Sequence, residues 1–175
     1  MMRLILACIM LCVFTQGKAQ KLKIDQLEQL LDASIDGAEE SLFLQGYSFL
    51  SKRDLQDSAG VIYSFSNRKK TIGTAKLVRK GAYYKEPLNS YMEYITYDRN
   101  EFEAFRKLMI DNQFIREDLS ISENSVYRKD NLKVNFRVST DEYENLIYEV
   151  KICRLKAMIE EKAAKKLNLK NIFKQ

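Results

Sequence analysis

The chain has 175 residues, of which 46% are hydrophobic and 30% charged, and its formal net charge is +5. This composition suffices for one ordinary hydrophobic core and argues against a disordered chain. Histidine is absent, which excludes Ser-His and Cys-His pairs, histidine metal ligands and an imidazole pH switch. Chemistry based on carboxylates, lysine, tyrosine or cysteine remains open.

Residues 1–19 are predicted to be a signal peptide. Arg3 supplies a positive charge, and Leu4–Phe14 is an apolar run of 11 residues, whereas a membrane-spanning helix needs about 20. Small residues before Gln20 suit a signal peptidase. We expect cleavage after Ala19, which predicts an exported protein, periplasmic or secreted, with no transmembrane segment in the mature chain. A retained anchor and lipoprotein processing at Cys8 are the alternatives.

Cleavage after Ala19 would remove Cys8 and Cys12 and leave Cys153 as the one cysteine of the mature chain. An intramolecular disulfide is then impossible, so the core has to stabilise the fold. In an oxidising compartment a lone thiol is either buried and inert or paired with another chain.

Lys21–Gly46 is predicted to be helical and to end at Gly46, which adopts the left-handed cap without steric cost. Gly37 lies inside the pattern and disfavours a continuous helix, so a break near Ser34–Gly37 would give two short helices. The apolar residues that keep helical spacing are Leu27, Leu31, Ile35, Ala38 and Leu42.

After Gly46 the apolar period changes from helical to two, which is typical of half-buried strands. Gly81 and Pro87 then enclose a loop. The strand candidates of this half are Tyr47–Phe49, Val61–Phe65 and Ile72–Arg79.

Tyr91–Asp118 reads as a strand, a helix and a second strand. Asp98 or Asn100 can accept hydrogen bonds from the free N–H groups at the helix start. The apolar stripe of this helix consists of Phe102, Phe105 and Met109. The strand candidates beyond it are Phe114–Ser120, Val134–Val138 and Leu146–Ile152.

These elements predict a single α+β domain over residues 20–153, an antiparallel sheet with two helical segments against one face. The aromatic side chains expected on the helix-covered face are Tyr47, Phe49, Tyr63, Phe65, Phe136 and Tyr148. They are most simply core, and a ligand cavity among them is the alternative.

The order of elements also suggests a tandem α-β-β-β repeat. The stretch from Ile35 to Tyr47 matches Phe102 to Phe114 at a displacement of 67, and Val61–Ser66 matches Val134–Ser139 at 73. The alternative is that any helix followed by a strand meander needs the same pattern.

The mature chain begins with a helix, a Gly-aromatic pair and alternating strands. The pattern Asp98-x-x-x-Phe102-x-x-Phe105 follows, and then a second junction between a helix and an aromatic strand at Gln113-Phe114. This arrangement, behind an export signal that ends in Ala19-Gln20, resembles a class of uncharacterised small exported proteins of Gram-negative bacteria. The resemblance covers most of the mature chain, implies no activity and transfers no functional residue.

Residues 154–175 form a basic tail, with seven basic residues against Glu160 and Glu161. Leu155, Ile159, Ala163 and Leu167 keep helical spacing, which predicts a C-terminal helix. Three arrangements of this tail are open: it packs on the sheet, it lies at an anionic membrane surface, or it is partly disordered.

The strongest binding candidate is Arg68–Lys85, here called the basic hairpin, which contains no acidic residue. Such a segment attracts phosphate or carboxylate polymers, and tyrosines add faces for stacking or cation–π contact. The alternative is that its lysines keep an exposed hairpin soluble and prevent edge-to-edge pairing. The candidate partner-binding residues are Arg68, Lys69, Lys70, Lys76, Arg79, Lys80, Tyr83, Tyr84 and Lys85.

No catalytic, metal or cofactor motif is present in the sequence; Gly60, Gly73 and Gly81, for example, are isolated and form no phosphate-binding loop. We therefore expect an exported non-catalytic binding or interaction protein of the cell envelope. Its expected partner is a protein or an anionic envelope polymer and not nucleic acid. The alternative is a small envelope enzyme that uses carboxylate or Tyr/Lys chemistry in a cleft.

Overall fold

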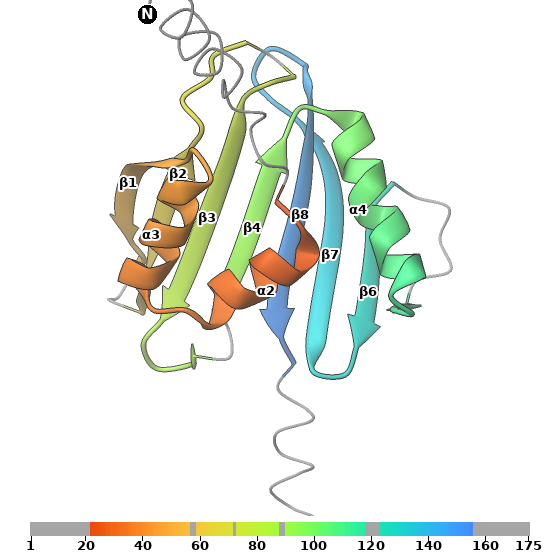
Figure 1. Cartoon of the computed structure of the whole chain (residues 1–175), viewed down its shortest axis with the longest axis horizontal. Helices are drawn as coiled ribbons and strands as arrows, with labels where there is room; N and C mark the ends of the chain where they lie inside the picture. Colours follow the sequence, from red (N-terminus) through yellow and green to blue (C-terminus); the bar gives the residue numbers. More distant parts are fainter. Residues whose placement is uncertain (1–21, 57–58, 72, 88–89, 118–122, 156–175) are drawn as a thin grey trace, which may run out of the picture.

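The computed structural model describes residues 22–56, 59–71, 73–87, 90–117 and 123–155. They form an eight-stranded antiparallel sheet with three helices against one face (Figure 1). The predicted α+β class is therefore confirmed. The predicted signal peptide lies outside these ranges, as do residues 156–175 of the predicted C-terminal helix, whereas Arg154, its first residue, is the last residue of the strand Leu146–Arg154.

The N-terminal helical region consists of two helices, α2 (Ile24–Asp32) and α3 (Ile35–Leu44). The break lies at Ala33-Ser34, because the Ser34 hydroxyl accepts a hydrogen bond from Gly37 N at 3.1 Å and so caps α3. The break expected near Ser34–Gly37 is thus present, and the described residues contain three helices where the sequence predicted two helical segments.

The strands form two antiparallel meanders that meet at the centre of the sheet. The first contains β1 (Ser48–Asp54), β2 (Gly60–Ser66), β3 (Lys76–Tyr83) and β4 (Tyr91–Thr96). Helix α4 (Arg99–Asp111) follows. The second contains β5 (Ile115–Arg116), β6 (Ser125–Lys129), β7 (Leu132–Thr140) and β8 (Leu146–Arg154). The spatial order is β1-β2-β3-β4-β8-β7-β6-β5.

Strand β6 was not predicted from the sequence. In Ser125–Lys129 the buried positions are taken by Ser125 and Tyr127, so only one large apolar residue marks the inner face. The predicted strand Phe114–Ser120 is also shorter, because the described part of it pairs only at Ile115 and Arg116. The expected order of elements therefore lacked one strand of the second meander.

The hydrophobic core lies between the sheet and the helices. Of the aromatic residues predicted to line it, Tyr47, Phe65, Phe136 and Tyr148 are buried. Phe49 was expected there as well but is 45% exposed, because it lies on the edge strand β1. Helix α4 buries its predicted stripe.

The two helix-to-strand junctions have the same hydrogen bonding. Tyr47 N donates to Leu42 O after α3, and Phe114 N donates to Met109 O after α4, both at 2.9 Å. The turn residue before each aromatic has a positive φ, 82° at Gly46 and 61° at Gln113. Gln113 therefore adopts the left-handed conformation that glycine adopts without strain.

Candidate functional site

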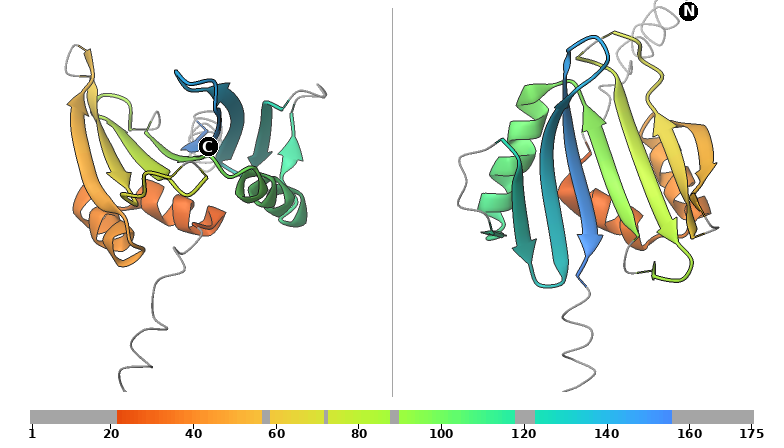
Figure 2. Two further views of the ribbon diagram at one scale, coloured as in Figure 1. Left: turned by 90° about the horizontal axis from the view of Figure 1, so that it is seen from above. Right: turned by 180° about the vertical axis from the view of Figure 1, so that it is seen from behind.

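The helices cover one face of the sheet, and the other face is concave in Figure 2, where both edges of the sheet bend away from the helices. Successive side chains of a strand point to opposite faces, so the residues between the buried core positions line this concave face. Its acidic strand residues are Glu93 and Glu149, whereas its basic strand residues are Arg53, Arg79, Arg128, Lys133, Arg137 and Lys151.

Tyr91 organises the middle of the concave face. Its ring fills the space above Gly81, where an added Cβ would lie 2.2 Å from Tyr91 Cε1. Lys151 Nζ lies 3.7 Å from the centre of the same ring, a cation–π contact. Tyr91 pairs with Cys153 on β8, and Cys153 pairs with Lys133 on β7. Two lysines thus border a buried tyrosine and a half-buried thiol.

Lys133, Lys151 and Arg53 form no salt bridge within the described residues, whereas the other three basic strand residues of the face do. Arg128 pairs with Glu117, Arg79 with Glu93 at 3.3 Å, and Arg137 with Glu149 at 3.7 Å. Two of these three unmatched positive charges, Lys133 and Lys151, therefore lie close to Cys153. This is the arrangement that attracts a negatively charged partner.

Burial raises the pKa of the Cys153 thiol, and the charges of Lys133, Lys151 and Arg128 oppose the shift without reversing it. A thiol with a raised pKa holds little thiolate, which is the nucleophilic form. Of the two alternatives for Cys153 given by the sequence, an inert thiol fits this environment better than a thiol that reacts with another chain.

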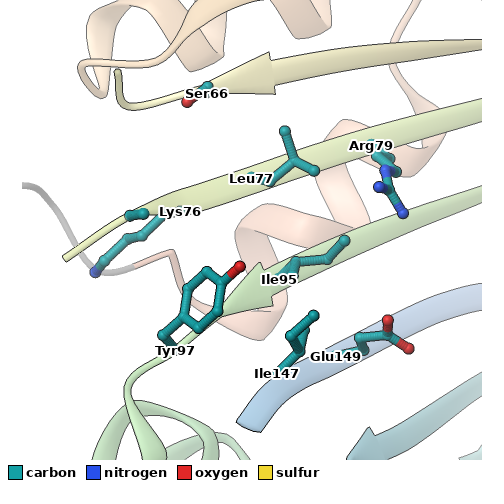
Figure 3. Close-up of a pocket in the computed structure, with 9 residues that line it drawn as sticks. Ser66, Lys76, Leu77, Arg79, Ile95, Tyr97, Ile147 and Glu149 are labelled. Carbon is teal, nitrogen blue, oxygen red and sulfur yellow. The ribbon is translucent and has the colours of Figure 1, made fainter. Parts of the chain in front are cut away.

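A hollow of about 220 Å³ lies at one end of the concave face, across β3, β4 and β8 (Figure 3). Leu77, Ile95 and Ile147 form its apolar floor, and Tyr97 and Glu149 stand at its sides. The loop that carries Arg68, Lys69 and Lys70 joins β2 to β3 beside the hollow, since Ser66 and Lys76 at its two ends both line it.

Two titratable groups of this hollow, Tyr97 and Glu149, have a raised pKa, and burial is the first cause in both. Burial raises the pKa of Glu149, repulsion from Glu93 raises it further, and attraction from Arg137 and Arg79 opposes both. Each carboxylate has an arginine partner, so neither is free. The two groups face solvent on an open sheet and not a deep cleft.

The basic hairpin does not form one surface. Its loop residues Arg68, Lys69 and Lys70 are exposed, and the Asn67 side chain shapes the loop by donating to Thr74 O at 2.7 Å and accepting from Lys76 N at 3.0 Å. Tyr84 and Lys85 are exposed at the opposite end of β3, where Tyr83 is half-buried. Arg79 lies between the two groups on the concave face.

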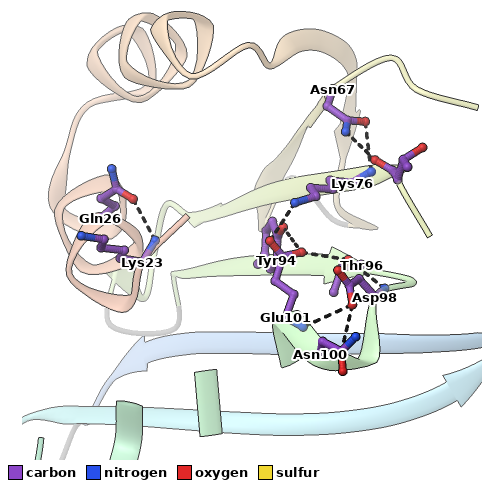
Figure 4. Close-up of polar contacts among 10 residues, drawn as sticks. Lys23, Gln26, Asn67, Lys76, Tyr94, Thr96, Asp98, Asn100 and Glu101 are labelled. Atoms are coloured by element: carbon purple, nitrogen blue, oxygen red, sulfur yellow. Dashed lines mark hydrogen bonds and ion pairs between the residues drawn. The ribbon is translucent and has the colours of Figure 1, made fainter. Parts of the chain in front are cut away.

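Two candidate residues face the helices instead, which corrects the expectation of an exposed hairpin. Lys76 Nζ binds Glu101 Oε1 at 2.7 Å (Figure 4), and the Lys76 and Glu101 side chains are 9% and 2% exposed. Lys80 is 6% exposed and donates to Leu30 O and Leu31 O at 2.6 and 2.9 Å. The reason is the strand period, since Lys76 and Lys80 lie on the same face as buried Val78.

Sequence reasoning missed Lys133 and Lys151 because they are isolated charges in strands rather than members of a run. The available signal was alternation: Lys133 lies between buried Leu132 and Val134, and Lys151 between buried Val150 and Ile152. A sum of outward-facing charges over all predicted strands would have identified them.

Within the described ranges, no group of three or more metal-binding side chains converges. None of the described helices is both long and apolar enough to cross a membrane. No model of a known protein family matches the chain, and no curated protein or solved structure is detectably similar to it. The resemblance to small exported bacterial proteins therefore stays a prediction from the sequence.

Proposed function

We propose that the protein is an exported, non-catalytic binding protein of the cell envelope that holds an anionic partner against the concave face of its sheet. The observation that carries this proposal is the pair Lys133 and Lys151, which lie beside Tyr91 and Cys153. Neither lysine forms a salt bridge within the described residues. The exposed loop residues Arg68, Lys69 and Lys70 extend the basic surface past the hollow.

Binding of heparin, used as a model polyanion, tests this proposal. The double variant Lys133→Gln/Lys151→Gln should bind about tenfold more weakly. Its affinity should also depend less steeply on salt, because fewer counterions are exchanged, as for nucleic acids. The matched control is Lys52→Gln/Lys107→Gln, which removes the same charge from exposed residues outside the concave face. Equal weakening in both variants would assign the attraction to net charge.

The export part of the proposal rests on residues 1–19 and is tested separately. The protein purified from its native host should have the intact mass of a chain that begins at Gln20, or of the same chain with a cyclised N-terminal glutamine. A cytoplasmic protein that retains Met1 would contradict export.

We further propose that the two meanders are tandem copies of one unit. The matching hydrogen bonds after α3 and α4 support this, as does the central pairing of β4 with β8. The sequence match at a displacement of 73 aligns β2 with β7. By position in the sheet, however, β2 of the first meander is equivalent to β6 of the second. The repeat would explain how one unbroken concave face arises from two halves.

A small envelope enzyme is the second candidate, and Glu149 is the observation that favours it. A carboxyl group with a raised pKa in a hollow beside Tyr97 is suited to act as a general acid. The arginine partners of Glu149 and Glu93 and the open sheet favour binding instead. Hydrolysis of a glycoside or ester panel by the wild type, abolished in Glu149→Gln, would select the enzyme.

A further inference from the structure

A second hollow, of about 480 Å³, lies on the helix-covered side of the sheet. It is bounded by the junction between α2 and α3 and by β2 and β3. Its apolar walls include Leu31, Ile35, Val61 and Ala82. Its volume falls within the range of small-molecule sites in proteins, which are mostly apolar with a few polar groups that fix orientation.

Lys80 is the basic residue that lines this hollow, and Asp32 is the acidic one. Lys80 lines the hollow while being 6% exposed, and its ammonium donates to the carbonyls of Leu30 and Leu31 in the last turn of α2. An ammonium has three donors, and these two bonds are the hydrogen bonds that Lys80 Nζ forms among the described residues. One donor of a buried cation is therefore left for another acceptor.

The Lys80 ammonium is hydrogen-bonded to two carbonyl oxygens and forms no salt bridge among the described residues. Burial lowers the pKa of Lys80, and attraction from Asp32 opposes the shift. The Asp32 carboxylate is itself engaged by the Arg154 guanidinium, with Arg154 Nε at 3.3 Å from Asp32 Oδ1. A buried cation without a paired anion is costly, so an anionic group beside Lys80 would be favoured.

We propose that this hollow binds a small amphipathic carboxylate of the fatty-acid class. The carboxylate accepts the remaining donor of Lys80, and the hydrocarbon chain lies along Leu31, Ile35, Val61 and Ala82. The site is separate from the concave face, because Lys80 and Val61 project to the helix side of the sheet. It therefore does not depend on the proposed binding of a larger anionic partner.

Calorimetric titration of the chain from Gln20 to Gln175 with octanoate and octylamine tests the head group. These two ligands each contain eight carbon atoms and differ in the charge of the head group. Octanoate should bind at least about tenfold more tightly, since a charge-assisted hydrogen bond is among the stronger polar contacts. Equal affinities, or no binding of octanoate, would overturn the proposal.

Substituting Lys80 itself is a poor test, because Lys80→Met also removes the hydrogen bonds to α2 and could prevent folding. The apolar wall of the hollow is therefore tested with Lys80 intact. Ala82→Leu fills the hollow without touching the amine and should weaken octanoate binding about tenfold or more. Ala75→Leu makes the same change in the hollow of the concave face and should leave the affinity unchanged. Equal affinities of the two variants would place the ligand elsewhere and overturn the assignment.

Discussion

Lys76 and Glu101 form a buried salt bridge that joins β3 to the first turn of α4, with Lys76 Nζ 2.7 Å from Glu101 Oε1. The second carboxylate oxygen of Glu101 accepts from Tyr94 Oη at 2.8 Å and from Thr96 Oγ1 at 3.1 Å. Three elements therefore meet at one carboxylate. The arrangement holds the start of α4 over the end of β4 where the two halves of the sheet join.

Replacing Lys76 by Met should destabilise the fold by about 3–5 kcal/mol, because the mutation leaves a buried carboxylate without its cation. Urea denaturation measures the free energy of unfolding. The double variant Lys76→Met/Glu101→Leu should lose less than the sum of the two single losses, since it removes both charges. Additive losses would mean that the two charges do not stabilise each other.

Gln113 has φ of 61° in the turn after α4, a conformation that costs a residue with a side chain roughly 1–2 kcal/mol. Gln113→Gly should therefore raise the free energy of unfolding by about 0.5–1 kcal/mol, after the entropy cost of glycine is subtracted. The matching substitution in the turn after α3 is Gly46→Ala. No atom lies within 4 Å of the added Cβ, so any loss in the free energy of unfolding comes from the backbone conformation alone. Destabilisation by Gln113→Gly would contradict the equivalence of the two turns.

The raised pKa of Glu149 predicts how stability depends on pH. The ionised form of Glu149 is disfavoured in the folded state, so its ionisation lowers the free energy of unfolding. This loss is absent below the ordinary pKa of 4.5 and grows as pH rises toward the raised pKa. Glu149→Gln removes the ionisation, and its stability relative to the wild type should increase over this window. Urea midpoints at pH 4 and pH 7 measure the change, with exposed Glu39→Gln as reference. A relative decrease would contradict the assigned shift.

The sequence predicted those elements whose apolar residues follow a clear period. Asp98 or Asn100 was expected to cap α4, and Asp98 does so by accepting from Asn100 N at 2.9 Å. Phe102, Phe105 and Met109 were expected on its buried stripe and are buried there. Local spacing determines these features, so a single chain is enough to infer them.

The candidate site was harder to predict because it depends on contacts between distant segments. Lys80 belongs to a basic run, yet its partners are carbonyls of Leu30 and Leu31, some 50 residues away in the chain. Lys151 and Tyr91 meet only because β8 crosses to the centre of the sheet and pairs with β4. Charge runs in the sequence do not show which face a strand presents.

Lysine side-chain NMR tests whether a polyanion binds the concave face of the sheet. Reductive ¹³C-methylation keeps the lysine charge and gives each accessible amine its own signal, assigned from single Lys→Arg variants. On titration with heparin we predict that the Lys133 and Lys151 signals shift first and saturate together, while the Lys107 signal on α4 stays unchanged. Shifts of the Lys107 signal equal to those of Lys133 and Lys151 would contradict binding at the concave face.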